Sequence, residues 1–258
     1  MRILVTNCNT TEAMTEEICQ GARRAAAPGT LIHGLTPSWG PESAEGWLDS
    51  YLSAAAVLDL LRGEAEDAAA GGEPFHAVVM AGFGEHGREG ARELLDVPVV
   101  DITEAAAHLA CLLGRRYAVV TTLDRTRGQI EDSLHTAGVA GHCAAVVGTG
   151  LGVLELDDRS RSLAAMGTAA GRARAAGAEV LVLGCAGMSQ WADELAARTG
   201  MPVVDGVAAA VKLAEALVGL GLNTSRVGSY GRPLPKRRLW SRPEAAPPVP
   251  EAAPQPAD

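Results

Sequence analysis

The residue whose setting most strongly suggests chemistry is Cys185, which follows the apolar run Val180 to Leu183 and precedes a turn of small residues. Nearly continuous Val and Leu predict a buried parallel strand, and the small residues after it predict a sharp turn into a helix. A thiol at that turn would lie at the carboxyl end of a strand, where open α/β sheets bind ligands. The helix N-terminus would also lower the pKa of the thiol. Cysteine equally suits a space-filling role behind a sheet, so other segments must decide between packing and chemistry.

Short polar residues follow two other apolar runs, and they could assist a thiol in proton transfer. A thiolate could remove a proton next to a carbonyl, while amide, hydroxyl and backbone N–H groups hold the enolate oxygen that develops. This chemistry requires no organic or metal cofactor. The polar residues are Asn7, Asn9 and Thr10 after the first run, and Thr121 and Thr122 at the end of a later one.

The segments with these residues belong to two halves that resemble each other. MAGFGEHG in the first half aligns with LGCAGMSQ in the second, and VPVVDITEAAA aligns with MPVVDGVAAAV. The offsets are nearly the same, since Gly82 and Cys185 lie 103 residues apart and Asp101 and Asp205 lie 104 apart. Several units repeated in one order indicate a duplication. We therefore predict an α/β fold of two pseudo-symmetric, Rossmann-like lobes with parallel sheets, and an active site in the cleft between them.

Strands and helices are expected to alternate through both halves. The predicted strands are 2–6, 29–35, 77–81 and 97–101, then 117–121, 143–147, 179–183 and 201–205. The first lobe is expected to comprise residues 1–104 with about 213–236, and the second lobe residues 105–212. A Pro/Ala-rich tail, 241–258, has no periodicity and is expected to be disordered. Asp101 and Asp205, at strand ends, could belong to the site or cap the next helix.

Composition argues against several classes of function. The net charge of −9 and the absence of a long Lys/Arg cluster argue against a nucleic-acid partner. No apolar stretch approaches the length of a membrane span, and Met1 leads into a strand rather than a signal peptide. Five cysteines without CxxC spacing indicate reduced thiols in a cytoplasmic protein, and the scattered histidines offer no metal site.

The segment Gly82 to Gly87 has a second interpretation, because it satisfies GxGxxG and Asp101 follows about twenty residues later. That spacing is typical of a dinucleotide-binding turn. Against this, the motif follows the third predicted strand rather than the first, and the duplication explains the same glycines as the counterpart of GCAG. A further alternative is a protein that binds a small molecule in this pocket without catalysis.

Together these motifs resemble the hydantoin and allantoin racemases of the aspartate/glutamate racemase superfamily, over nearly the whole chain to about residue 236. The resemblance is carried by the Asn7–Thr11 turn with Met14 and Thr15, and by GFGEHG, VTTL, LGCAGM, DGVAAA, GLNTS and GSY. It implies a cofactor-free isomerase with two cysteines, one per lobe, acting as acid and base on opposite faces of a substrate carbon. The substrate would be a hydantoin, an allantoin-like compound, a substituted malonate or an amino acid. We also expect a homo-oligomer.

The chain departs from this family pattern at Gly82, where the resemblance places the first cysteine, whereas Cys185 matches the second. Two-base racemisation needs a proton donor on each face, so His86, Glu85 or Cys8 would have to replace the missing thiol. The same Gly/Cys pattern resembles arylmalonate decarboxylase, which keeps the second-lobe cysteine and protonates one face. If the alignment holds, Gly82→Cys is expected to create or raise racemisation.

The expected site therefore has Cys185 as its catalytic residue, with His86 and Glu85 as the leading candidates for a second acid or base. The expected substrate-binding residues are Asn7, Asn9, Thr10, Gly82, Phe83, Gly84, Thr121, Thr122, Gly184, Ala186 and Gly187.

Overall fold

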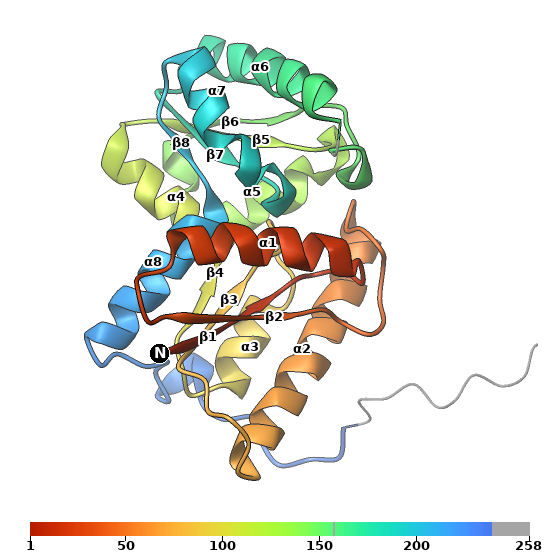
Figure 1. Cartoon of the computed structure of the whole chain (residues 1–258), viewed down its shortest axis with the longest axis vertical. Helices are drawn as coiled ribbons and strands as arrows, with labels where there is room; N and C mark the ends of the chain where they lie inside the picture. The colour runs from red at the N-terminus through yellow and green to blue at the C-terminus, as the bar shows by residue number, and fades with distance from the viewer. Residues whose placement is uncertain (157, 239–258) are drawn as a thin grey trace, which may run out of the picture.

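The computed structural model describes residues 1–156 and 158–238. They form two four-stranded sheets in which every pairing is parallel. Figure 1 shows the sheets in separate halves of the molecule, with β1 to β4 in the lower half and β5 to β8 in the upper half. The tail predicted at 241–258 lies outside the described residues.

Both sheets have the same strand order, which confirms the two pseudo-symmetric α/β lobes. The first runs β2-β1-β3-β4 and the second runs β6-β5-β7-β8. The first sheet consists of β1 (Arg2–Thr6), β2 (Leu31–Leu35), β3 (Ala77–Met80) and β4 (Val99–Asp101). The second consists of β5 (Tyr117–Thr121), β6 (Cys143–Gly148), β7 (Val180–Leu183) and β8 (Val203–Val204).

Helices connect the strands in the predicted order. They are α1 (Glu12–Ala25), α2 (Trp47–Ala69), α3 (Arg88–Leu94), α4 (Ile102–Leu113), α5 (Arg127–Thr136), α6 (Arg159–Ala175), α7 (Ala192–Thr199) and α8 (Gly206–Gly219). One difference concerns the site, because Cys185 does not start an α-helix. A 3₁₀ segment, η4 (Ala186–Trp191), lies between the end of β7 and α7.

The central strands are buried on both faces. Val78 and Val79 in β3, like Leu181 and Val182 in β7, have no exposed surface. Helices cover both sides of a parallel sheet, and this is why the strands read as continuous Val and Leu rather than as an alternating pattern. Burying each such side chain stabilises the fold by roughly 1.5–3 kcal/mol.

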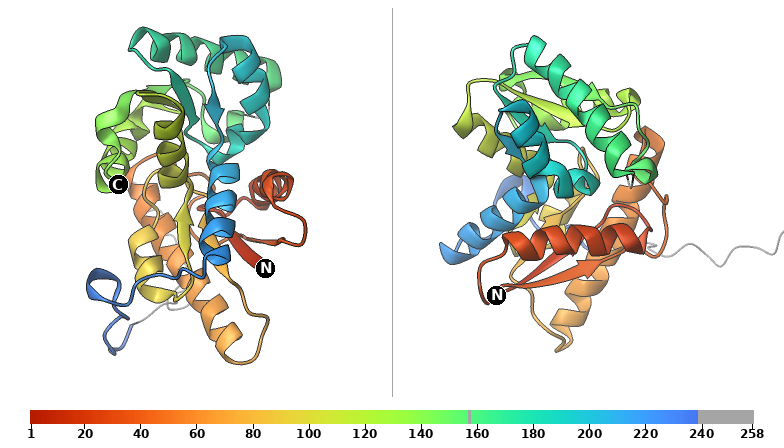
Figure 2. Two further views of the ribbon diagram at one scale, coloured as in Figure 1. Left: turned by 90° about the vertical axis from the view of Figure 1, so that its left-hand side faces the viewer. Right: turned by 45° about the horizontal axis from the view of Figure 1, so that its top comes forward.

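Two helices, α4 and α8, pack against each other between the lobes. α4 packs on β7 of the second sheet, while α8 packs on β3 and β4 of the first. Figure 2 shows α8, in blue, running along the first lobe. Each helix is capped by the aspartate before it, because the carboxylates of Asp101 and Asp205 accept two N–H groups of the following turn. The capping interpretation of both aspartates is thereby confirmed.

After α8 the chain returns to the first lobe as a strap across α3. Arg226 forms an ion pair with Asp96 at 2.6 Å, and the Tyr230 hydroxyl donates to Glu89 of α3. The strap therefore supports the helix that follows the Gly82–Gly87 loop.

Candidate active site

A partly open cavity lies between the lobes. Its wall includes the residues that follow β1, β3 and β7 and the end of β5, so the carboxyl ends of the central strands of both sheets meet there. Parallel α/β sheets bind ligands at this edge. The lining consists of Asn7, Cys8, Asn9, Met14, Ile18, Ala44, Ala81, Gly82, Phe83, His86, Thr121, Thr122, Thr126, Gln129, Ile130, Val153, Gly184, Cys185 and Ala186.

Most predicted site residues line this cavity. Those on the lining are Asn7, Asn9, Gly82, Phe83, His86, Thr121, Thr122, Gly184, Cys185 and Ala186. Thr10, Gly84, Glu85 and Gly187 are not part of the lining described above. The hydroxyl of Thr10 donates instead to the carbonyl of Pro41 over 3.4 Å.

Several lining residues were not anticipated, and only some of them could have been. Met14 and Ile18 lie four residues apart on α1, a spacing that predicts a shared helix face. Ala44 lies in the segment before α2 of the first lobe, and Val153 begins a short 3₁₀ segment of the second lobe. They approach because the Val153 N–H donates to Glu45 Oε1 over 2.8 Å, a contact that no local pattern indicates.

Cys185 occupies the position after Gly184 at the end of β7 and is half-buried at the cavity. Burial raises the pKa of its thiol to about 11, and the negative charge of Glu45 raises it further, while an N–H from Gly187 acts in the opposite direction. The expectation that a helix start lowers this pKa is therefore wrong. The following segment is only a six-residue 3₁₀ helix, and desolvation outweighs its N–H groups.

The Asn7–Asn9 turn is a rigid part of the first-lobe wall. Asn7 Nδ2 donates to Asn9 Oδ1 over 2.9 Å and to Thr15 Oγ1 over 3.1 Å. Asn9 Oδ1 also accepts the N–H of Thr11 over 3.0 Å. Because both asparagines are buried and hydrogen-bonded, they hold the turn and its middle residue, Cys8, in one conformation.

His86 lies on the cavity wall beside Gly82, but both of its ring nitrogens face neighbouring protein groups. Nε2 is 3.3 Å from the carbonyl oxygen of Phe83. Nδ1 is 3.3 Å from Ser50 Oγ. Burial lowers the pKa of His86 to about 4, and the ring is therefore neutral near pH 7.

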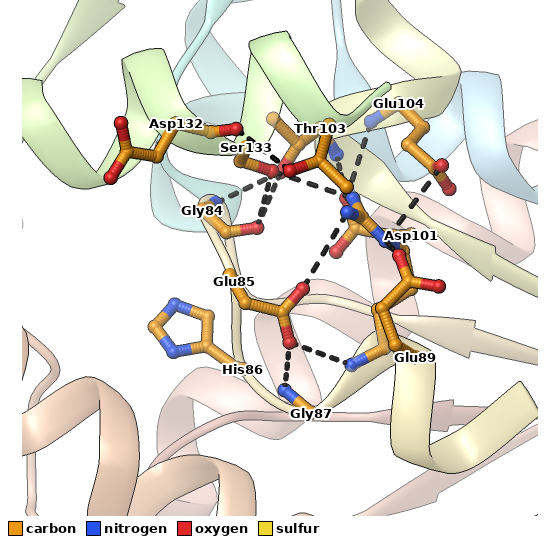
Figure 3. A network of polar contacts seen from close by, with 12 residues as sticks. Gly84, Glu85, His86, Gly87, Glu89, Asp101, Thr103, Glu104, Asp132 and Ser133 are labelled. Carbon is orange, nitrogen blue, oxygen red and sulfur yellow. Dashed lines mark hydrogen bonds and ion pairs between the residues drawn. The ribbon is translucent and has the colours of Figure 1, made fainter. Parts of the chain in front are cut away.

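A buried cluster of charges fixes the loop that contains Gly82 and His86. Arg88 is 1% exposed and lies 3.6 Å from Asp101 and 2.8 Å from Glu89. Ser133 Oγ donates to the carbonyl of Gly84 over 3.0 Å and thereby ties the loop to α5 in the second lobe. Figure 3 shows this network, with the His86 ring turned away from it.

The carboxylate of Glu85 belongs to that network. It accepts the N–H groups of Gly87 and Arg88 over 2.6 and 3.0 Å at the start of α3, as Figure 3 shows for Gly87. A bound pyrophosphate would use the N–H groups of a helix start. Because Glu85 already uses these two, the structure disfavours the dinucleotide interpretation of GFGEHG.

Within residues 1–156 and 158–238, no helix combines the length and apolar character needed to cross a bilayer. Within the same residues, no three His, Cys, Asp or Glu side chains converge as ligands of one metal ion would.

Comparisons with known proteins agree with this architecture. The Asp/Glu/hydantoin racemase family model matches residues 3–214. The chain is 37% identical over 242 residues to a hydantoin racemase of Paenarthrobacter aurescens, a match covering 93% of this chain and 100% of that protein. The crystal structure of allantoin racemase from Pseudomonas fluorescens has 52% identity and a TM-score of 0.87, covering 93% and 100% of the two chains. Arylmalonate decarboxylase, at 20% identity with a TM-score of 0.59 over 90% of this chain and 98% of its own, shares the fold. The chain belongs to the Asp/Glu/hydantoin racemase family.

Proposed function

We propose that this racemase-type isomerase interconverts the enantiomers of a small cyclic ureide related to hydantoin or allantoin, with Cys185 as an acid and base. The observation that carries the proposal is the position of Cys185, at the end of β7 and on the wall of a cavity between two lobes. The relatives named hydantoin racemase and allantoin racemase support this choice of substrate class.

The chemistry follows from the groups on the cavity wall. A ureide of this class carries a C–H next to a carbonyl, and the Cys185 thiolate removes that proton while the electron pair moves to the carbonyl oxygen. Thr122 is a suitable donor to the oxygen, because the residue lines the cavity and its hydroxyl forms no hydrogen bond with another described residue. Donors of this kind stabilise a developing enolate.

Gly82 is the equivalent of Cys185 in the first lobe, and we propose that it occupies the place of the family's first cysteine. Gly82 is the second residue after β3, just as Cys185 is the second residue after β7. The two strands hold the same place in sheets of identical order. Since glycine has no ionisable side chain, one-face proton transfer is the rival outcome that an assay must distinguish.

The test is hydrogen–deuterium exchange in heavy water, with optical rotation followed in parallel. The substrates are the separate enantiomers of allantoin and of a 5-substituted hydantoin, with an aryl-substituted malonate for comparison. We expect exchange of the carbon-bound proton together with loss of optical rotation for a ureide. Cys185→Ser should lower the exchange rate by about 100-fold or more, the scale of general acid–base catalysis.

Three results would contradict the proposal. Exchange with retained optical rotation would indicate one-face chemistry. Preference for the malonate, with release of carbon dioxide, would indicate a decarboxylase. No exchange with any of these compounds would indicate a protein that binds its ligand without catalysis.

A further inference from the structure

Gln129 belongs to the second lobe, and its side chain reaches a residue of the first lobe. It lies on α5 and lines the cavity together with Thr126 and Ile130. Thr126 precedes Gln129 by three residues and Ile130 by four, which places the three side chains on one side of the helix start. Gln129 is only 4% exposed, so its polar atoms need hydrogen-bond partners.

The side-chain amide of Gln129 has one orientation that satisfies its neighbours. Its Nε2 donates to Ser50 Oγ of α2 over 3.0 Å, and the Ser50 hydroxyl donates to the backbone carbonyl of Glu85. A hydroxyl has one proton and a carbonyl can only accept, so Ser50 must accept from the amide. The NH₂ group of Gln129 therefore faces Ser50, and its oxygen, Oε1, is left for another partner.

The loop after β3 packs on the same end of the Gln129 side chain. A Cβ on Gly84 would lie 2.9 Å from Nε2 of Gln129 and 3.5 Å from its Cδ. Gly84 has a φ of +119°, in the region that favours glycine, so the backbone itself approaches the amide closely. The end of the side chain that carries Nε2 is thus enclosed by Ser50 and Gly84.

The Oε1 atom of Gln129 is an acceptor without a partner in the described part of the chain. It accepts no hydrogen bond from any residue of 1–156 and 158–238. It is also not among the side-chain atoms of those residues that lack both a partner and access to solvent. Since the space that Gln129 borders is the cavity, this oxygen is available to a ligand that brings a donor.

A neutral acceptor on this wall suits a ureide. A cyclic ureide alternates N–H donors with carbonyl acceptors around its ring, and Thr122, also on the second-lobe wall, offers the complementary hydroxyl donor. A malonate has no N–H, and its carboxylates would face the acceptor oxygen of Gln129. A carboxylate in place of the amide could also accept, but its charge would disfavour the Cys185 thiolate.

We propose that Gln129 is a specificity-determining residue whose Oε1 accepts a ring N–H of the substrate, and that Ser50 is the positioning residue that orients its amide. This inference rests on the proposed function. The contact selects compounds that carry an N–H in the ring, and malonates cannot form it. Gln129 takes no part in the proton transfer itself, because its amide neither gains nor loses a proton.

The test removes the N–H from the substrate and the oxygen from the protein. Exchange in heavy water is measured for a 5-substituted hydantoin and two analogues. In the first, an oxazolidinedione, a ring oxygen replaces the N–H beside the reacting carbon. In the second, a methyl group blocks the nitrogen between the two carbonyls.

The proteins compared are the wild type, Gln129→Met, Gln129→Glu and the control Gln20→Met. Methionine keeps the length of the side chain but has only a weak acceptor, whereas glutamate keeps an acceptor oxygen. Gln20 is an exposed glutamine of α1 outside the cavity lining, so its replacement controls for the substitution itself.

The quantity compared is the ratio of the hydantoin exchange rate to that of each analogue. Gln129→Met should lower this ratio by about 10-fold for one analogue, because the hydrogen bond is lost while differences in size and acidity between the compounds persist. The analogue concerned identifies the N–H that Gln129 accepts. Gln129→Glu should keep the ratio while its charge slows all three compounds, and Gln20→Met should change neither ratio nor rate.

Two results in Gln129→Met would overturn the inference. One is an unchanged ratio for both analogues, and this includes a fall of all three rates by a common factor, as expected if Gln129 only holds Ser50 and the loop. The other is an equal loss of the ratio in Gln129→Glu, which would assign the effect to packing. Both leave the proposed function standing, because the wild-type protein still exchanges the hydantoin. No exchange of any compound by the wild-type protein would refute the proposed function, and the role of Gln129 with it.

Discussion

An alanine at position 82 would place a methyl group where the side chains of Cys8 and His86 already lie. Its Cβ would be 2.7 Å from the Cys8 Cβ, whereas contacting carbon atoms lie about 3.5–4.0 Å apart. Gly82 is not among the glycines with positive φ, so backbone strain adds nothing to this overlap. Overpacking of this kind costs about 1–3 kcal/mol, and we expect Gly82→Ala to lower the free energy of unfolding by that amount.

A double-mutant cycle separates the contribution of Cys8 from that of His86. Cys8→Gly removes both Cys8 atoms that the new methyl group would overlap. We therefore expect Cys8→Gly/Gly82→Ala to be less destabilised than the sum of the single changes, with a coupling of about 0.5–3 kcal/mol. Urea denaturation followed by circular dichroism gives the four free energies, provided that the denaturant slopes agree.

Gly171 supplies a control for adding a methyl group elsewhere. It lies within α6, and a Cβ there would meet nothing within 4 Å. Gly171→Ala should raise the free energy of unfolding by about 0.5–1 kcal/mol, because alanine is the better helix former. If Gly82→Ala were neutral, or additive with Cys8→Gly to within about 0.3–0.5 kcal/mol, Cys8 would not occupy the space beside Gly82.

A related pair of substitutions has a functional readout, because it places a cysteine rather than an alanine at position 82. The sequence suggested that Gly82→Cys alone would raise racemisation, but the structure leaves no room for that side chain beside Cys8. The predicted rise in racemisation now applies to the double variant Cys8→Gly/Gly82→Cys, in which only the His86 side chain has to shift. This double variant should interconvert the enantiomers faster than Cys8→Gly alone in the optical-rotation assay.

Three further predictions concern the charges around the cavity. Folding lowers the pKa of His86 from 6.5 to about 4, so its contribution to stability is complete above pH 6.5 and is lost as pH falls through about 4. The free energy of unfolding, measured by urea denaturation, should fall by up to about 3 kcal/mol between pH 7 and pH 4. In His86→Gln this dependence on pH should be smaller. Arg88→Met should lower the free energy of unfolding by about 3–5 kcal/mol, because it leaves Asp101 buried without its ion pair. Adding Asp101→Asn should recover part of that free energy in the same denaturation assay. Glu45→Gln should lower the pKa of the Cys185 thiol, because the carboxylate raises it, and the pH dependence of iodoacetamide labelling at Cys185 should move to lower pH.

Much of the fold and part of the site could be predicted from the sequence. The repeated order of strands predicted two similar parallel sheets, because each buried strand has a continuous apolar run. The cap positions of Asp101 and Asp205 follow from local chemistry at strand ends. The pKa of Cys185 could not be predicted in this way, since it depends on burial and on Glu45, 140 residues away in the chain. The role of Glu85 at the start of α3 could have been anticipated, because acidic residues stabilise helix N-termini.

The relation between Cys8 and Gly82 shows what an alignment of single positions misses. An alignment asks which residue follows β3, and glycine there indicates the loss of a thiol. Catalysis depends instead on which atoms occupy a given place on the cavity wall, and that place borders β1 as well as β3 because the sheet order sets these strands side by side. β1 and β3 are separated by more than 70 residues, so their pairing is not visible in either segment alone. Gly82 therefore leaves the space that the side chains of Cys8 and His86 occupy at the first-lobe wall, and a glycine after β3 is required by this packing.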